Sequence, residues 1–131
     1  MPSPSRRYRV LIVDDEPEIR LVLDRILTNG GYHTTQAFDP ADAIRLLASW
    51  KPVDLLVTDV AMPDMTGDEL VRRARETQPD LKVLYVTGFA DRLSKDKSVA
   101  EREPLLEKPF TPAALLEAVS RVLFGHPRGI E

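Results

Sequence analysis

The chain has 131 residues, enough for one domain with its own hydrophobic core, and it contains no cysteine. Disulfides and thiolate metal sites are therefore excluded, and any bound metal would need oxygen or histidine ligands. Eighteen basic and twenty-one acidic residues give a formal net charge of -3, which offers no electrostatic argument for binding to a nucleic acid or an anionic membrane. We therefore expect a protein or a small molecule as the partner.

The amino-terminal segment, MPSPSRRYRV, is rich in proline, serine and arginine. The apolar run that follows has only four residues before an acidic residue, far fewer than an export signal or a membrane span requires. We expect residues 1–7 to be a flexible tail. We also expect the short ending GHPRGIE, residues 125–131, to be a tail, and the protein to be cytoplasmic.

Short apolar runs alternate with segments of helical spacing along the chain. The first run, VLIV, is unbroken, as expected for a strand covered on both faces, and the next apolar residues recur every three or four positions. The expected strands are 10–13, 34–37, 54–58, 81–87 and a short one around 105–106. Helices are expected from 17 to a stop at 30–31, from 40 to about 50, over 68–76 and 91–100, and from 111 to about 123.

Two helix starts carry clear capping signals. Asp39 precedes Pro40, and Thr111 precedes a second proline, which places a side-chain cap before a residue suited to the first helical turn. Trp50 closes the second helix and is expected to be a packing residue. The segment 91–100 is highly polar, so we expect its helix to be mobile or to become ordered only on a partner.

Five successive strand–helix units predict an α/β domain over residues 8–124, with a doubly wound, five-stranded parallel sheet and helices on both faces. In such sheets, ligands bind beyond the carboxyl ends of the strands. Five residues that follow or end strands should therefore meet at one edge of the sheet: Asp14, Asp15, Asp59, Thr87 and Lys108.

Three of these residues are carboxylates, which would repel one another strongly. Two unit charges 4 Å apart cost about 4 kcal/mol at an effective dielectric constant near 20, so a cation should lie among them. Oxygen ligands favour Mg²⁺, and Lys108 adds a second positive charge. Such a site suits a phosphoryl group, with a carboxylate as the nucleophile. Taken alone, Asp14 and Asp15 could also be solvated loop charges or charges at a helix N-terminus.

The segments VLIVDDEP, LLVTDVAMPDMTG, VLYVTG and LLEKPF together resemble, in this order and spacing, the receiver domain of two-component response regulators. The resemblance covers residues 8–123, nearly the whole chain. It implies a flavodoxin-like fold with strand order 2-1-3-4-5 and a cytoplasmic phosphorelay protein that carries an aspartyl phosphate.

The resemblance also implies a set of metal ligands. Asp15 and Asp59 would bind Mg²⁺ directly, and Asp14 would act mainly through water. The backbone carbonyl of Ala61, two residues after Asp59, would complete the ligands that the protein supplies. Mg²⁺ is the cofactor that we expect.

The remaining roles that the resemblance implies concern the phosphoryl group. Asp59 would accept it from the phosphohistidine of a histidine kinase or a histidine phosphotransfer protein. Thr87 would hydrogen-bond one phosphoryl oxygen, and Lys108 would pair with another. The peptide bond between Lys108 and Pro109 would be cis, which is rare enough to be a local test.

One expected switch position departs from the family's pattern. Members of the family commonly place Tyr or Phe three residues before the lysine, where the ring swings inward as the threonine moves, but this chain has Leu105 there. Phe89, two residues after Thr87, could replace that ring or could simply pack on the fourth helix. The switch residues are thus expected to be Thr87, Phe89 and Leu105.

The function that we expect is a phosphorylation-operated signalling switch, read by a partner on the face of helix 4, strand 5 and helix 5. Apart from its own phosphorylation and dephosphorylation, the protein would not be an enzyme. The alternatives are a phosphate-independent binding module and an aspartate-based phosphohydrolase, which usually needs an acid where this chain has Ala61. The chain could be a free-standing protein, which its ends favour, or the receiver part of a hybrid kinase.

Overall fold

The computed structural model describes residues 7–50, 52–88 and 104–125, and in this part of the chain five parallel strands form one sheet in the order β2-β1-β3-β4-β5. The strands are β1 (Arg9–Val13), β2 (His33–Ala37), β3 (Leu55–Thr58), β4 (Lys82–Gly88) and β5 (Leu105–Lys108). The helices are α1 (Pro17–Asn29), α2 (Pro40–Ser49), α3 (Gly67–Thr77) and α6 (Pro112–Phe124). The predicted fold class and strand order are confirmed.

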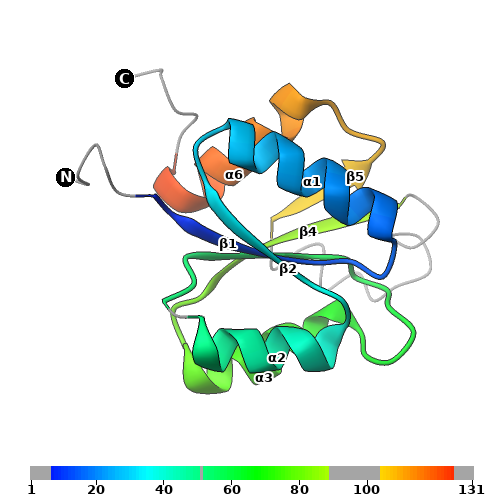
Figure 1. The fold of residues 1–131 in the computed structure, drawn as a ribbon, viewed down its shortest axis with the longest axis vertical. Coiled ribbons are helices and arrows are strands. Elements are labelled where there is room, and N and C mark those ends of the chain that lie inside the picture. The colour runs from blue at the N-terminus through cyan, green and yellow to red at the C-terminus, as the bar shows by residue number, and fades with distance from the viewer. Residues whose placement is uncertain (1–6, 51, 89–103, 126–131) are drawn as a thin grey trace.

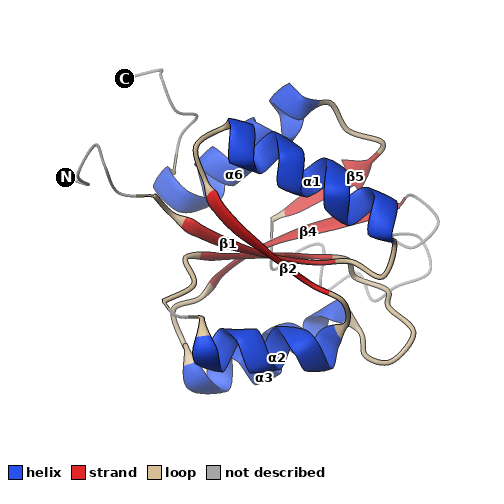
Figure 2. Ribbon diagram, in the orientation of Figure 1, coloured by secondary structure: helices blue, strands red, loops and turns tan. Residues whose placement is uncertain are grey.

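Helices cover both faces of the sheet. Figures 1 and 2 show α1 and α6 on one face and α2 and α3 on the other. Each face has its own hydrophobic core, one around Ile12 and Leu27 beneath α1 and α6, the other around Leu56 and Leu70 beneath α2 and α3. None of the described helices is long and apolar enough to cross a membrane.

The inner strands of the sheet are more deeply buried than the two edge strands. All four residues of β3 are buried, and so are the last four of β1, because these strands are covered on both faces. The edge strands β2 and β5 are mostly half-buried. The unbroken apolar runs in the sequence therefore belong to strands inside the sheet, whose carboxyl ends lead into the acidic segments.

The capping predictions at two helix starts are confirmed. The Asp39 carboxylate accepts a hydrogen bond from the Asp42 backbone N–H at 2.8 Å, and the Thr111 hydroxyl accepts one from the Ala114 N–H at 3.0 Å. A third cap, Thr66 before α3, accepts from the Glu69 N–H at 3.4 Å. The helix expected over 91–100 lies outside the described residues.

Trp50 packs at the end of the sheet where β1 and β2 begin. Its ring centroid is 5.2 Å from the guanidinium carbon of Arg9 and 5.4 Å from the His33 ring, which meets it edge-on. Arg9 and His33 are the first residues of their strands. The packing role predicted for Trp50 is confirmed, and it lies at the end of β1 opposite to Asp14.

Gly67 brings the start of α3 against the end of β3. Its N–H donates to the Val60 carbonyl at 2.7 Å, and a β-carbon on Gly67 would come within 2.2 Å of the Asp59 carbonyl oxygen. A backbone atom cannot yield as a flexible side-chain end can. A residue without a side chain is therefore required where this loop folds back on the backbone of Asp59.

Replacing Gly67 with alanine should lower the free energy of unfolding by about 1–3 kcal/mol, because the added methyl group overpacks the loop against Asp59. Urea denaturation followed by circular dichroism measures the change. Asp68→Ala is the control, since it alters the next, exposed residue without approaching the backbone of Asp59. Equal losses in the two variants would contradict the steric explanation.

Candidate functional site

Three carboxylates meet at the carboxyl ends of β1 and β3. The two strands are paired in parallel, with Val13 opposite Thr58, so the residues that follow them emerge side by side. Asp14, Asp15 and Asp59 each offer a carboxylate oxygen, and these oxygens all lie within 4.8 Å of one another. Asp14 and Asp59 are buried, with exposed fractions of 1% and 3%, whereas Asp15 is exposed. The convergence predicted from the sequence is therefore present.

Lys108 supplies the positive charge among these carboxylates. Its Nζ lies 3.1 Å from Asp14 Oδ2, 3.3 Å from Asp59 Oδ2 and 3.4 Å from Glu16 Oε1. Lys108 ends β5 in register with Gly88, the last residue of β4, and its side chain reaches back to the ends of β1 and β3. The peptide bond that follows Lys108 is cis.

The two buried carboxylates are held in the same way. Asp14 accepts the Glu16 backbone N–H on Oδ1 at 2.9 Å, and Asp59 accepts the Ala61 N–H on Oδ1 at 3.2 Å. In each residue the other oxygen, Oδ2, faces Lys108. One oxygen of each carboxylate is thus held by a backbone N–H of the local turn. The other oxygen is paired with the Lys108 ammonium group, which a bound ligand could displace.

Burial and charge act on these groups in opposite directions. Burial raises the pKa of Asp14 above its ordinary value of 3.8, although the Glu16 backbone hydrogen bond and Lys108 both lower it. For Lys108, burial lowers the pKa, but the Asp14 and Asp59 carboxylates outweigh burial and raise it above 10.5. Folding raises the pKa of Asp14. The folded state therefore loses stability relative to the unfolded state as the pH rises from 3.8 through the pKa that Asp14 has in the folded protein, because the carboxylate then becomes ionised. A cation bound to the ionised carboxylate would offset that cost.

Thr87 lies at the end of β4, beside β5. It is fully buried, and its Oγ1 has no hydrogen-bond partner among the described residues. A buried hydroxyl normally has a partner, so an unpaired one points to a ligand or a water at this place. Leu105, at the start of β5, is half-buried and packs against the core beneath α2 and α3, while Phe89 lies outside the described residues.

The residues present fit a magnesium ion. The donor set consists of carboxylate oxygens, the hard ligands that Mg²⁺ prefers, and it lies where charge repulsion needs a cation. Ala61 lies two residues after Asp59 in the β3–α3 loop, and its N–H donates a hydrogen bond to the Asp59 carboxylate.

Sequence reasoning gave two residues at this site too small a role. Glu16 is not among the predicted site residues, yet its carboxylate contacts Lys108. Arg20 was overlooked, although it is only 8% exposed and donates a hydrogen bond to the Asp14 carbonyl. The sequence does indicate that Arg20 is buried, because Arg20 shares helical spacing with Leu23 and Leu27, which are the other buried residues of α1.

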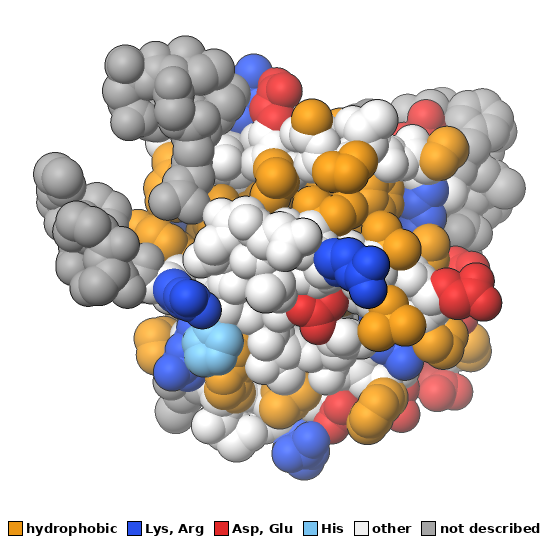
Figure 3. Space-filling model, turned by 45° about the horizontal axis from the view of Figure 1, so that its top comes forward, with side chains coloured by type: hydrophobic (Ala, Val, Ile, Leu, Met, Phe, Trp, Pro, Cys, Tyr) orange, Lys and Arg blue, Asp and Glu red, His pale blue; other side chains and the backbone are white. Residues whose placement is uncertain are grey.

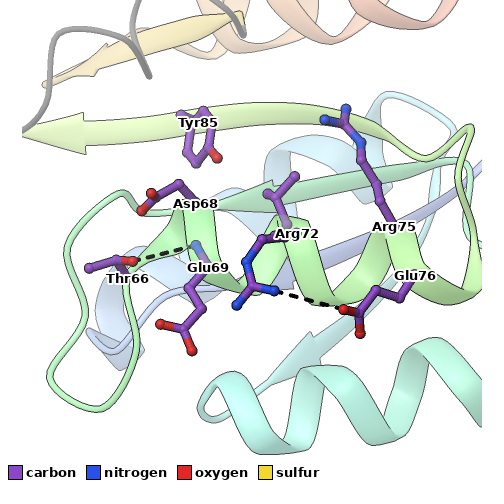
Figure 4. A pocket seen from close by; sticks show the side chains of 8 residues that line it. Thr66, Asp68, Glu69, Arg72, Arg75, Glu76 and Tyr85 are labelled. Atoms are coloured by element: carbon purple, nitrogen blue, oxygen red, sulfur yellow. Dashed lines mark hydrogen bonds and ion pairs between the residues drawn. The ribbon is translucent and has the colours of Figure 1, made fainter.

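A separate hollow of about 560 Å³ lies beside α3 and Tyr85 of β4 (Figure 4). Among its charged side chains, Arg72 pairs with Glu76 at 3.7 Å, and both of these are exposed. On the face shown in Figure 3, basic side chains are dispersed among acidic and hydrophobic ones. We assign chemistry to the acidic cluster alone.

The strand order defines a flavodoxin-like α/β domain, and the carboxylates at the strand ends form a cluster that could hold a cation. Residues 10–120 match the family described as the response regulator receiver domain, and the chain belongs to this family. It is 38% identical over 116 residues to the response regulator receiver protein CpdR of Brucella abortus, covering 88% of this chain and 96% of that protein.

Two further relatives differ in length. The sensor kinase CckA of Brucella abortus is 34% identical over 116 residues, which are 87% of this chain but only 12% of that kinase. The crystal structure of a CheY-like receiver domain protein from Methanospirillum hungatei superposes with a TM-score of 0.79 at 31% identity, covering 90% of this chain and 94% of that one. The family thus includes relatives about as long as this chain and one that forms part of a larger kinase.

Mg²⁺ should stabilise the protein, and Asp15→Asn should abolish the gain, because a ligand bound only by the folded state stabilises it by mass action. At ten times the dissociation constant, the gain is about 1.4 kcal/mol. Thermal melts with and without Mg²⁺ measure it. The control is Asp64→Asn, which changes an exposed aspartate outside the cluster and should keep the full gain. An unchanged melting midpoint in the parent protein would contradict the metal site.

Proposed function

We propose that this receiver domain is a switch operated by phosphorylation of Asp59. The observation that carries the proposal is the place of Asp59, a buried carboxylate that clusters with Asp14 and Asp15 and pairs with Lys108. This arrangement supplies a nucleophile and the positive charge that a phosphoryl group needs. The phosphoryl donor would be the phosphohistidine of a kinase or a phosphotransfer protein.

Asp59 is the acceptor that the topology favours. It follows β3, the middle strand of the sheet, so it lies between Asp14 after β1 and Thr87 at the end of β4. A phosphoryl group on Asp59 would be reached by groups from both sides. Asp14 and Asp15 would hold the metal, and Asp64 is exposed farther along the β3–α3 loop.

The transfer would move one phosphoryl group from nitrogen to oxygen. A carboxylate oxygen of Asp59 attacks phosphorus, the P–N bond breaks, and its electron pair stays on the donor imidazole. Lys108 would exchange its carboxylate contact for a phosphoryl oxygen, and the Thr87 hydroxyl, which has no partner among the described residues, would donate to another. Bound Mg²⁺, held by Asp14, Asp15, Asp59 and the Ala61 carbonyl, would neutralise the charge on the phosphoryl oxygens.

The same exchange would carry the signal to the surface. Lys108 ends β5, so a change in its partner acts on an edge strand that packs beside α6. We infer that β5 and α6 belong to the face that a downstream partner reads, together with the expected fourth helix. Leu105 occupies the position of the usual aromatic switch residue, so Phe89 would have to take over that role or the switch would operate without a ring.

The proposed phosphodonor is a histidine kinase or a histidine phosphotransfer protein. The relative within the sensor kinase CckA supports a place in a kinase pathway. On α1, which begins beside the acidic site, Leu21 and Val22 are 62% and 47% exposed, so an apolar surface is available for a protein partner. We propose a cytoplasmic protein whose receiver domain spans residues 8–124.

Two other functions are less well supported. A phosphohydrolase of this type needs an acid to protonate the leaving group, and Ala61 stands in that place. A phosphate-independent binding module would not need the two buried carboxylates, the lysine between them and a buried Thr87 hydroxyl that has no partner in the described part of the chain. The switch uses all of these groups.

Asp59→Asn should lose the phosphoryl group that the parent protein takes up. We expect the parent to gain one hydroxylamine-sensitive acyl phosphate from acetyl phosphate and Mg²⁺, seen by intact-mass measurement, and the variant to gain none. Asp64→Asn should label like the parent, because Asp64 lies outside the cluster. Full labelling of Asp59→Asn, with an unchanged circular dichroism spectrum, would overturn the assignment of the acceptor.

The phosphorylated protein should lose its phosphate slowly, because Ala61 offers no polar group to orient the attacking water. Ala61→Asn should speed the decay roughly tenfold, which corresponds to about 1.4 kcal/mol of barrier. The measurement is the decay of the phosphorylated mass after the donor is removed. Met62→Leu, a volume-conserving change at the next residue, controls for disturbance of the loop. Equal decay in Ala61→Asn and the parent would refute the role of this position.

A further inference from the structure

Arg20 is a buried cation close to the acidic site. It lies on the inner face of α1 with only 8% of its surface exposed, and one guanidinium nitrogen donates to the backbone carbonyl of Asp14. Among the described residues its Nε has no hydrogen-bond partner, and it forms no ion pair. Burying a guanidinium without a carboxylate is costly, so its position calls for an explanation.

The carbonyl that Arg20 binds belongs to the peptide unit that joins Asp14 to Asp15. A peptide unit is planar and contains the Cα atoms of both residues. Holding its oxygen therefore restrains the orientation of the peptide plane to which the Cα atoms of both residues belong. The Glu16 N–H, bonded to Asp14 Oδ1 at 2.9 Å, fixes the next peptide of the same turn.

Phe38 covers the outer side of Arg20. Its ring centroid lies 5.8 Å from the guanidinium carbon, although the residue is 72% exposed. The Phe38 backbone N–H donates to Asp42 Oδ2 at 3.2 Å, which ties the residue to the start of α2. The ring lies over the guanidinium, where a cation–π contact favours the positive charge of Arg20.

We propose that Arg20 is a positioning residue of the metal site and that Phe38 shields it. Arg20 would act through the Asp14–Asp15 peptide and not through contact with the metal or the phosphoryl group. The proposal rests on the proposed function, because it assumes that Asp14 and Asp15 hold Mg²⁺. Mg²⁺ needs near-ideal octahedral ligand placement, so a loosened turn should weaken its binding.

Two substitutions separate positioning from charge. Arg20→Met keeps a long side chain but removes the charge and the hydrogen bond, whereas Arg20→Lys keeps the charge and loses the guanidinium fork. If Arg20 positions the turn, the Mg²⁺ dissociation constant, measured by calorimetry, should rise about 10- to 100-fold in Arg20→Met and less in Arg20→Lys. Arg25→Met, at an exposed position on the same helix, is the control and should bind like the parent.

Other roles for Arg20 give different results. If it acts only as a charge near the cation, Arg20→Met should bind Mg²⁺ more tightly. If it only fills space, Arg20→Met should melt at a lower temperature with an unchanged dissociation constant. Either result would overturn the proposal.

A measurement without metal tests the positioning directly. In EDTA, the Glu16 amide should exchange with deuterium at least several-fold faster in Arg20→Met than in the parent, because its acceptor sits in the loosened turn. Phe38→Ala should show a smaller effect in the same direction, and Arg25→Met none. Unchanged exchange in Arg20→Met would overturn the positioning role even if Mg²⁺ binds. Failure of the parent to bind Mg²⁺ would instead overturn the proposed function.

Discussion

The contact of Lys108 with two buried carboxylates is the interaction on which the site depends. Asp14 and Asp59 follow neighbouring strands, so the parallel sheet forces two like charges together away from water. The positive charge comes from β5, at the edge of the sheet, and reaches them across the end of β4. The outermost strand is thereby tied electrostatically to the middle of the fold, and any group that competes for the carboxylates also acts on that strand.

The sequence was sufficient to predict most of the fold and the residues that meet at the site. The buried residues are apolar from Val10 to Val13 in β1 and from Leu55 to Val57 in β3, as expected for strands covered on both faces, and the parallel order brings Asp14, Asp59 and Lys108 to one edge. Strand ends were less predictable. Asp54 was expected in β3, but its carboxylate accepts the Arg9 backbone N–H at 2.8 Å, an interaction that no local pattern indicates.

Other features could not be predicted because they arise from the packing of distant segments. The need for glycine at 67 comes from the backbone of Asp59, eight residues earlier, which approaches only once the loop has folded back. The buried position of Arg20 is visible in the helical spacing, but its acceptor is a backbone carbonyl, which has no signature in the sequence. Contacts to backbone atoms depend on the path of the chain and not on the type of residue contacted.

The position of Trp50 has a consequence for spectroscopy. It is the single tryptophan of the chain, and it touches the first residues of β1 and β2. The five residues of β1 span about 16 Å, so the indole and the carboxylates lie at opposite ends of that strand. Its fluorescence emission should therefore follow the integrity of the sheet and be nearly silent to events among the carboxylates. The fluorescence of Trp50 can thus serve as an internal reference for a second fluorophore placed near the carboxylates at the carboxyl end of β1.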